Sequence, residues 1–305
     1  MQLFSRMGKR FITLYATVVV LLLVAAGLWV CRASANPQRV FWGMINQSLA
    51  TNGVTVQAKQ GSGTTSVHQT VQYSLGGENL SHSLTTLSQN GTTVTDEMIG
   101  TPTADYTRYV SITTSQKSAS GKPLDFSSIL GLWAKNAGTS GTGKGVLLSQ
   151  AVLGSGLPLG GAVVPIGNLS PQLRSKLVSQ IRQQNVYQID FASVKKMRHN
   201  GRTEYIYEAT FQPILYASMI KRFAQETGLH DLDQLDVNSF SGQQALHVTL
   251  TVDARSYHLV RASAGSGGSG VTQSYSSYDV PALVTVPQHP LSQTELQQRL
   301  ANLQK

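Results

Sequence analysis

The chain begins with an uninterrupted apolar run before its pattern becomes mixed. Residues 11–30 read F-I-T-L-Y-A-T-V-V-V-L-L-L-V-A-A-G-L-W-V and contain no charged residue. A helix of this length spans about 30 Å, the thickness of a bilayer's hydrocarbon core. Basic residues precede the run, and no acidic residue occurs before residue 36. The positive-inside rule therefore predicts a single-pass anchor at the cell membrane, with the N-terminus cytoplasmic. We expect residues 1–35 to form the cytoplasmic tip and anchor, and residues 36–305 to lie outside.

A secretory signal peptide is the alternative interpretation of the same segment. Ala33-Ser34-Ala35 has the small-x-small form of a cleavage site, so cleavage after Ala35 would release a secreted protein. The apolar run is longer than the roughly 7–15 residues of a typical signal-peptide core, which favours the uncleaved anchor. Cys31 is the only cysteine, so an intramolecular disulfide and a cysteine-based metal site are excluded.

Apolar residues recur at helical spacing in several later segments. Residues 37–50 have apolar positions at 40, 41, 44, 45 and 49. Ser170-Pro171 reads as an N-cap followed by proline in the first turn, and it starts a helix that runs to residue 183. One face of this helix carries Leu173, Leu177, Val178 and Ile181. Further helices are predicted over residues 214–227, ended by Gly228, and over residues 292–303.

Strict alternation of apolar and polar residues marks the strands. Residues 67–75 alternate in this way, and Asn90-Gly91 is a strong hairpin signal between the next two strands. With residues 105–112 these segments predict a meander of four or five antiparallel strands. Residues 198–202 read R-H-N-G-R and predict another turn between strands. A second group of strands is predicted at 204–211, 245–253, 257–263 and 271–280.

The periodic pattern is lost between about residues 113 and 170, where glycine is dense. This range is predicted to be a flexible insertion within one extracytoplasmic domain, residues 36–305. Residues 138–145 read G-T-S-G-T-G-K-G and resemble a phosphate-binding P-loop. Gly145 stands where the motif needs a hydroxyl, and neither flank fits the required strand and helix. A nucleotide site is therefore rejected.

Charge and chemistry exclude several classes of function. Charged residues make up 13% of the chain, and its net charge of +9 is partly due to four basic residues that flank the apolar run, Arg6, Lys9, Arg10 and Arg32. No basic helix or arginine cluster follows, so nucleic acid is rejected as a partner. The chain also lacks H-E-x-x-H and G-x-S-x-G. We therefore predict no enzyme activity, no metal site and no cofactor.

The order of elements resembles a known family of bacterial envelope proteins. The similarity is carried by I-G-T-P-T-A-D-Y-T-R-Y, Y-I-Y-E-A-T-F-Q-P, L-H-V-T-L-T-V-D-A-R-S-Y-H-L-V-R and S-Y-S-S-Y-D-V-P-A-L-V-T-V-P. In this order, after an N-terminal helix, they resemble the LolA/LppX/LprG-like superfamily over residues 37–112 and 170–290. The resemblance implies an α+β fold, a curved antiparallel β half-barrel covered by helices, here preceded by one transmembrane helix. It also implies a cavity that carries a lipid or an acyl chain.

The residues themselves allow two functions. A curved sheet with an apolar face needs a cover, which the helices at 37–50, 171–183 and 214–227 supply. If the cover leaves a cavity, the protein binds a lipid or other apolar ligand, and the apolar side of each strand lines the site. The candidate lining residues are Val71, Tyr73, Leu84, Leu87, Tyr106, Tyr205, Tyr207, Leu246, Val248 and Leu250. If the cover fills the concavity, the protein is a non-enzymatic scaffold or interaction module for an unknown protein partner.

Overall fold

The computed structural model describes residues 36–76, 79–118, 121–136, 164–228, 232–233, 235–265 and 270–303. The predicted anchor at 11–30, the alternative cleavage site after Ala35 and the glycine-dense residues 137–163 lie outside these ranges. Within the described ranges, no helix is both long and apolar enough to cross a membrane.

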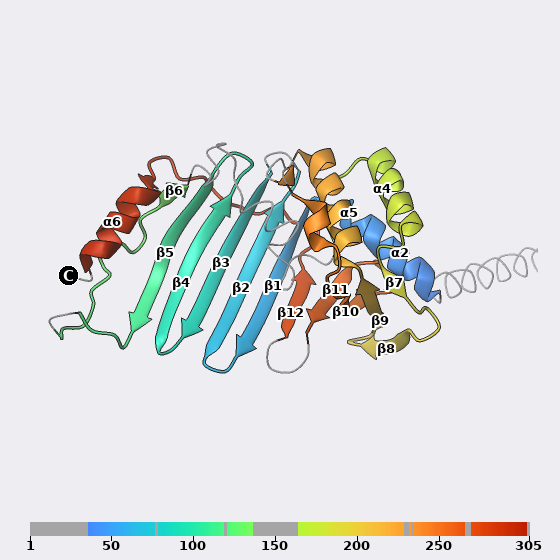
Figure 1. Ribbon diagram of the computed structural model, residues 1–305, viewed down its shortest axis with the longest axis horizontal. Helices are drawn as coiled ribbons and strands as arrows, with labels where there is room; N and C mark the ends of the chain where they lie inside the picture. Colours follow the sequence, from blue (N-terminus) through green and yellow to red (C-terminus); the bar gives the residue numbers. More distant parts are fainter. Residues whose placement is uncertain are drawn as a thin grey trace, which may run out of the picture.

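One 13-stranded open sheet dominates the described chain (Figure 1). From one end to the other the strands are β13 (Leu291–Ser292), β6 (Ala134–Asn136), β5 (Asp105–Thr114), β4 (Thr92–Gly100), β3 (Leu80–Gln89), β2 (Thr65–Ser74), β1 (Gly53–Ser62), β12 (Val271–Ser276), β11 (Leu259–Ala264), β10 (Leu246–Asp253), β9 (Arg202–Phe211) and β7 (Gln188–Ile189), with β8 (Lys195–His199) paired to β9 off this path. All pairs are antiparallel except β13 with β6. The predicted α+β class, with a large and mostly antiparallel sheet, is confirmed.

The meander β1 to β5 contains five strands, and its first strand was missing from the sequence prediction. β1 alternates Val54 and Val56 with polar residues, but small or polar residues follow at its later inner positions, Ala58 and Gln60. This weakened the periodic signal. β6 is a second addition, because it lies inside the range 113–170 and pairs with β5.

The tight turns follow from their sequences. Asn90 and Gly91 connect β3 to β4 with φ of 48° and 76°, the two positive values that a type I′ hairpin turn requires. Asn200 and Gly201 connect β8 to β9 in the same way, with φ of 49° and 77°. Asparagine and glycine tolerate this conformation better than other residues, which explains why both hairpins were visible in the sequence.

The predicted helices are present as α2 (Pro37–Ser48), α4 (Pro171–Gln183), α5 (Pro213–Thr227) and α6 (Gln293–Leu303). The side chains of Asn36 and Ser170 accept hydrogen bonds from the backbone N–H groups of Arg39 and Leu173, which satisfies free donors in the first turns of α2 and α4. Gly228, with φ of 73°, ends α5 in the left-handed conformation. A short 3₁₀ helix, η3 (Val237–Phe240), lies after α5.

The helices lie over the two ends of the sheet (Figure 1). α2, α4 and α5 lie by β1 and β9 to β12, whereas α6 lies at the opposite end by β5 and β6. The main core forms under the first group, around the fully buried Phe41, Tyr207, Phe211 and Phe223. A smaller core joins Leu296 of α6 to Ile129 and Ala134.

Candidate functional site

The strand register assigns each predicted lining residue to one face of the sheet. Directly paired residues of neighbouring strands share a face. Following the pairs from β9 to β5 defines an inner face, which carries the main core. It includes eight of the predicted residues, Val71, Tyr73, Leu87, Tyr205, Tyr207, Leu246, Val248 and Leu250. Leu84 and Tyr106 lie on the opposite, outer face, where they pair with Glu97 and Ile99.

Six of the inner-face residues are closely packed under the helices. Val71, Tyr73, Tyr205, Tyr207, Val248 and Leu250 are buried members of the main core. The Phe41 ring of α2 lies 5.5 Å from the Tyr207 ring, and the Tyr207 hydroxyl donates a 2.8 Å hydrogen bond to the carbonyl of Pro37. Burial raises the pKa of Tyr207, so its hydroxyl stays protonated as a donor. This part of the inner face is protein core.

The middle strands expose part of their inner face. Leu87 on β3 keeps 37% of its surface exposed, and its paired neighbours Val67 on β2 and Val94 on β4 are half-buried. These three residues belong to a longer cross-strand row. The row runs, pair by pair, through Ala209, Val248, Ala264, Val271, Gln60, Val67, Leu87, Val94 and Ile112. Gln60 is its single polar member, so an almost continuous apolar line joins the core under α2 to the core under α6.

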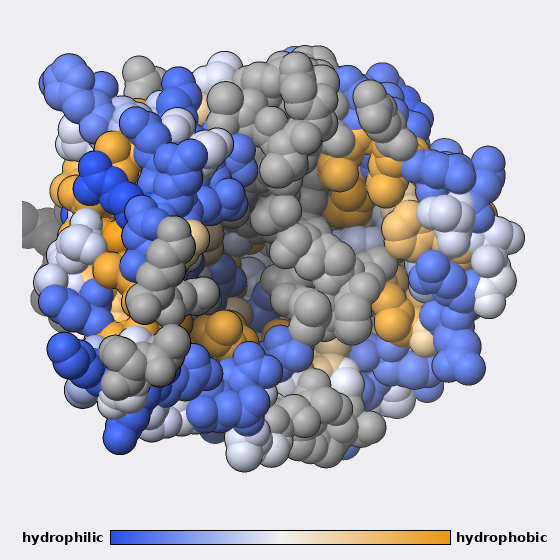
Figure 2. Space-filling view, turned by 60° about the vertical axis from the view of Figure 1, so that its left-hand side comes forward, coloured by the Kyte–Doolittle hydropathy of each residue, from blue (hydrophilic) through white to orange (hydrophobic). Residues whose placement is uncertain are grey.

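The neighbouring row of the inner face is polar in its centre. Gln69, Thr85 and Asp96 occupy adjacent strands there, and Tyr109 follows on β5. Burial raises the pKa of Asp96, an effect that a backbone hydrogen bond only partly offsets. The middle of the inner face thus places an apolar row beside a polar one. Figure 2 shows hydrophobic side chains set in hollows of the surface and rimmed by hydrophilic ones.

The outer face carries a charged cluster instead. His82 Nε2 lies 2.8 Å from one Glu97 oxygen, and Arg108 Nε donates to the other at 2.7 Å. The Arg108 guanidinium also stacks over the Trp133 ring, 4.7 Å from its centroid. Burial alone would raise the pKa of Glu97, but the hydrogen bonds and charges of His82 and Arg108 together lower it. Each of these groups is paired, which is typical of a structural cluster.

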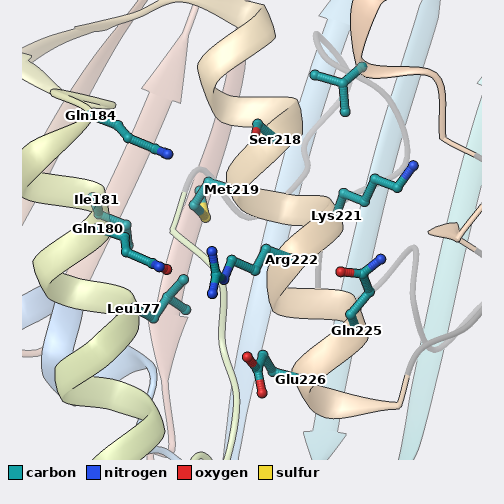
Figure 3. Close-up of a pocket in the computed structure, with 11 residues that line it drawn as sticks. Leu177, Gln180, Ile181, Gln184, Ser218, Met219, Lys221, Arg222, Gln225 and Glu226 are labelled. Carbon is teal, nitrogen blue, oxygen red and sulfur yellow. The ribbon is translucent and has the colours of Figure 1, made fainter.

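A groove between α4 and α5 forms a hollow at the covered end (Figure 3). Its cavity volume is about 330 Å³. Leu177, Ile181 and Met219 supply its apolar side chains, whereas Gln180, Gln184, Lys221, Arg222, Gln225 and Glu226 supply polar ones. Arg222 extends from α5 toward Leu177 and Gln180 on α4 (Figure 3).

A second hollow of about 230 Å³ lies at the other end of the same pair of helices. Its lining is mixed: Leu75, Ile166, Leu169, Leu173 and Phe223 are apolar, whereas Asn79, Asn168, Ser170, Glu226 and Thr227 are polar, and Glu226 borders both hollows. Lys176 of α4 reaches Glu226 of α5 at 3.5 Å. This ion pair connects the two helices where the hollows adjoin.

None of the groove residues was selected from the sequence, except as members of the two helices. The apolar spacing of α4 correctly indicated that Leu177 and Ile181 face inward. Nothing in that spacing tells which polar residues meet across a helix–helix seam, because this depends on the crossing of α4 with α5. Among the described residues, no group of three or more histidine, cysteine or acidic side chains is placed to hold a metal ion.

Two solved structures resemble this one over most of their own length. The structure is similar to LprF from Mycobacterium bovis, with a TM-score of 0.41 and 15% identity, covering 84% of this chain and 97% of that protein. It is also similar to the Mycobacterium tuberculosis lipoprotein LppX, with a TM-score of 0.35 and 14% identity, covering 80% of this chain and 98% of that protein. No protein-family model and no curated protein sequence matches the chain.

Proposed function

We propose that this protein is a non-enzymatic, membrane-anchored protein of the bacterial envelope that binds a lipid or other apolar ligand. In this proposal residues 11–30 cross the cell membrane, and residues 36–305 form one domain outside it. The open sheet acts as a half-barrel, and the ligand lies along the inner face of its middle strands.

The observation that supports this proposal is the apolar row through Val67, Leu87 and Val94. It continues a row whose first two members, Ala209 and Val248, are buried in the main core, yet Leu87 is 37% exposed. From β2 to β5 the row extends about 14 Å, at roughly 4.8 Å between neighbouring strands. An acyl chain laid along it gains about 0.8 kcal/mol for each methylene group removed from water. The polar row through Gln69 and Thr85 offers hydrogen bonds beside it.

The test compares two leucines of the same strand. Leu87 and Leu84 are similarly exposed, at 37% and 44%, but point to opposite faces of β3. The full chain, Leu87→Asp and Leu84→Asp are each purified and released from detergent micelles for native mass spectrometry. We expect a lipid-mass adduct on the full chain and on Leu84→Asp, and at least about tenfold lower occupancy on Leu87→Asp.

Equal lipid occupancy in the two variants would show that the ligand does not bind at the inner face. The proposed lipid binding would be excluded if the full chain carried no adduct and also failed to take up a fluorescent fatty acid. The second candidate, a scaffold or interaction module, would then be favoured. It has its own support, because six of the ten predicted lining residues are core residues packed under the helices.

A further inference from the structure

The groove between α4 and α5 contains an arginine without a partner among the described residues. Arg222 is half-buried, and it makes no hydrogen bond or ion pair with any other residue that the structure describes. Its charged neighbours in the groove are engaged. Lys221 donates a 2.8 Å hydrogen bond to the carbonyl of Leu235, and Glu226 is held by Lys176. The guanidinium therefore presents its N–H donors to the groove.

A second polar group of the groove is also unsatisfied. The side-chain oxygen of Gln180 is buried and has no hydrogen-bond partner. A buried acceptor in this state costs about 1–3 kcal/mol, and turning the side-chain amide toward the groove to meet a donor of a ligand would remove that cost. Gln180 and Arg222 come from different helices and lie across the groove from each other (Figure 3).

We propose that the α4–α5 groove binds a small oxyanion that carries a hydroxyl group, with the chemistry of glycerol phosphate. The planar guanidinium of Arg222 matches two phosphate oxygens, and the hydroxyl donates to Gln180. Leu177, Ile181 and Met219 provide an apolar surface for the carbon backbone. The volume of about 330 Å³ is at the lower end of the range of small-molecule sites. The ligand is either a free ester or the headgroup of a lipid such as phosphatidylglycerol.

This site is separate from the lipid site proposed above. The groove is lined by α4, α5 and Val237 of η3, and none of its residues belongs to the strands of the sheet. Loss of ligand binding at Leu87 would therefore leave the groove unaffected, and the reverse also holds. The two proposals can fail independently.

Methionine methyl NMR provides a local measurement on the full chain. The sequence has six methionines, of which Met219 lies in the groove and Met44 is buried in the core under α2. The chain, labelled at its methionine methyl groups, is placed in phosphatidylcholine nanodiscs and titrated with glycerol 3-phosphate, inorganic phosphate or glycerol. Met219→Leu assigns the signal. We expect a saturable shift of Met219 with glycerol 3-phosphate while Met44 stays constant.

Two variants test the two contacts separately. Arg222→Gln should weaken the binding of glycerol 3-phosphate at least about tenfold, because a charge-assisted hydrogen bond is lost. Arg198→Gln is the matched control, because it removes the same charge from the exposed strand β8 and should change nothing. Gln180→Leu should weaken the binding of glycerol 3-phosphate and leave the affinity for inorganic phosphate unchanged. The Met44 signal shows that each variant is folded.

A second set of nanodiscs distinguishes a lipid headgroup from a free ester as the ligand. A Met219 shift in phosphatidylglycerol discs without added ester assigns the site to a lipid headgroup, whereas a shift only with soluble ester assigns it to a free metabolite. The absence of a saturable shift under both conditions overturns the proposal. So does equal affinity in Arg222→Gln and Arg198→Gln. If Gln180→Leu leaves the affinity for glycerol 3-phosphate unchanged, the proposed hydrogen bond from the ligand hydroxyl to Gln180 is wrong.

Discussion

Strands β9 and β10 at one end of the sheet resemble β3 and β4 in the middle in length and antiparallel pairing, but not in side chains. The inner positions of β9 and β10 are mostly large and apolar, and most of them are buried in the core under α2 and α5. The corresponding positions of β3 and β4 are mostly serine, threonine or acidic, interrupted by Leu87, Val94 and Met98. The same backbone geometry is therefore stabilised by core packing at one end and mainly by strand ladders in the middle.

Cross-strand hydroxyl pairs on the outer face help to stabilise the middle strands. The hydroxyls of Thr86 and Thr95 lie 3.1 Å apart, and those of Ser88 and Thr93 lie 3.0 Å apart. Such pairs add only a few tenths to about 1 kcal/mol each. The middle strands therefore keep their fold without a filled core, which leaves their inner apolar row available for a ligand.

The largest expected effect is the loss of a core aromatic ring. Phe41→Ala removes a fully buried side chain that contacts Tyr207, Tyr187 and Phe191. We expect the free energy of unfolding to fall by about 3–5 kcal/mol in chemical denaturation. Leu87→Ala is the counterpart in the middle strands and should cost only about 0.5 kcal/mol. Similar losses in the two variants would contradict the difference between the two regions.

Two adjacent acidic residues of β4 should respond to substitution in opposite directions. Glu97 on the outer face has a lowered pKa, so its ionised form adds stability above the ordinary carboxyl pKa. That stability is lost as the pH falls through the lowered value. Glu97→Gln should therefore reduce the free energy of unfolding at neutral pH by roughly 1–3 kcal/mol, and the deficit should shrink in acid.

Asp96 on the inner face has a raised pKa, so its favourable neutral form is lost as the pH rises through that value. Asp96→Asn should increase the free energy of unfolding at neutral pH and have little effect in acid. Chemical denaturation of both variants from about pH 3 to about pH 8 measures how each free energy of unfolding changes with pH. A stabilising Glu97→Gln or a destabilising Asp96→Asn at neutral pH would show that the assigned environments are wrong.

The smallest effect concerns a single hydroxyl pair. A double-mutant cycle of Thr86→Val and Thr95→Val should give a coupling energy of about 0.2–1 kcal/mol. The control cycle pairs Thr86→Val with Thr210→Val, whose hydroxyl bonds to His247 near the other end of the sheet. We expect no coupling there, because the two sites share no partner. Coupling energies of equal size in both cycles would show that the contact between the Thr86 and Thr95 hydroxyls is not the source of the coupling.

Local signals explain how much of the fold was predictable. The four helices were found within one or two residues, because caps, prolines and the terminal Gly228 act within one turn of the chain. The Asn-Gly hairpins were visible for the same reason. β1 was overlooked because only two of its inner positions, Val54 and Val56, are large and apolar.

The candidate site was less predictable, because a face is a property of the whole sheet. Leu84 and Leu87 are three residues apart, so a regular strand must direct them to opposite faces, although both were chosen as lining residues. Tyr106 was assigned to the inner face, but its pairing with Ile99 places it outside. In each case the choice was made by residue type before the register was known.

The sequence by itself determined the helices, most strands, both Asn-Gly turns and the apolar N-terminal run, since each depends on periodicity or on a few adjacent residues. Only the tertiary structure decided which inner positions became core and which stayed partly exposed. It also brought Gln180 and Arg222, more than forty residues apart in the chain, to the same groove. The physical reason is that burial and polar contacts depend on how strands pair and helices cross, and these arrangements join residues that no local pattern connects.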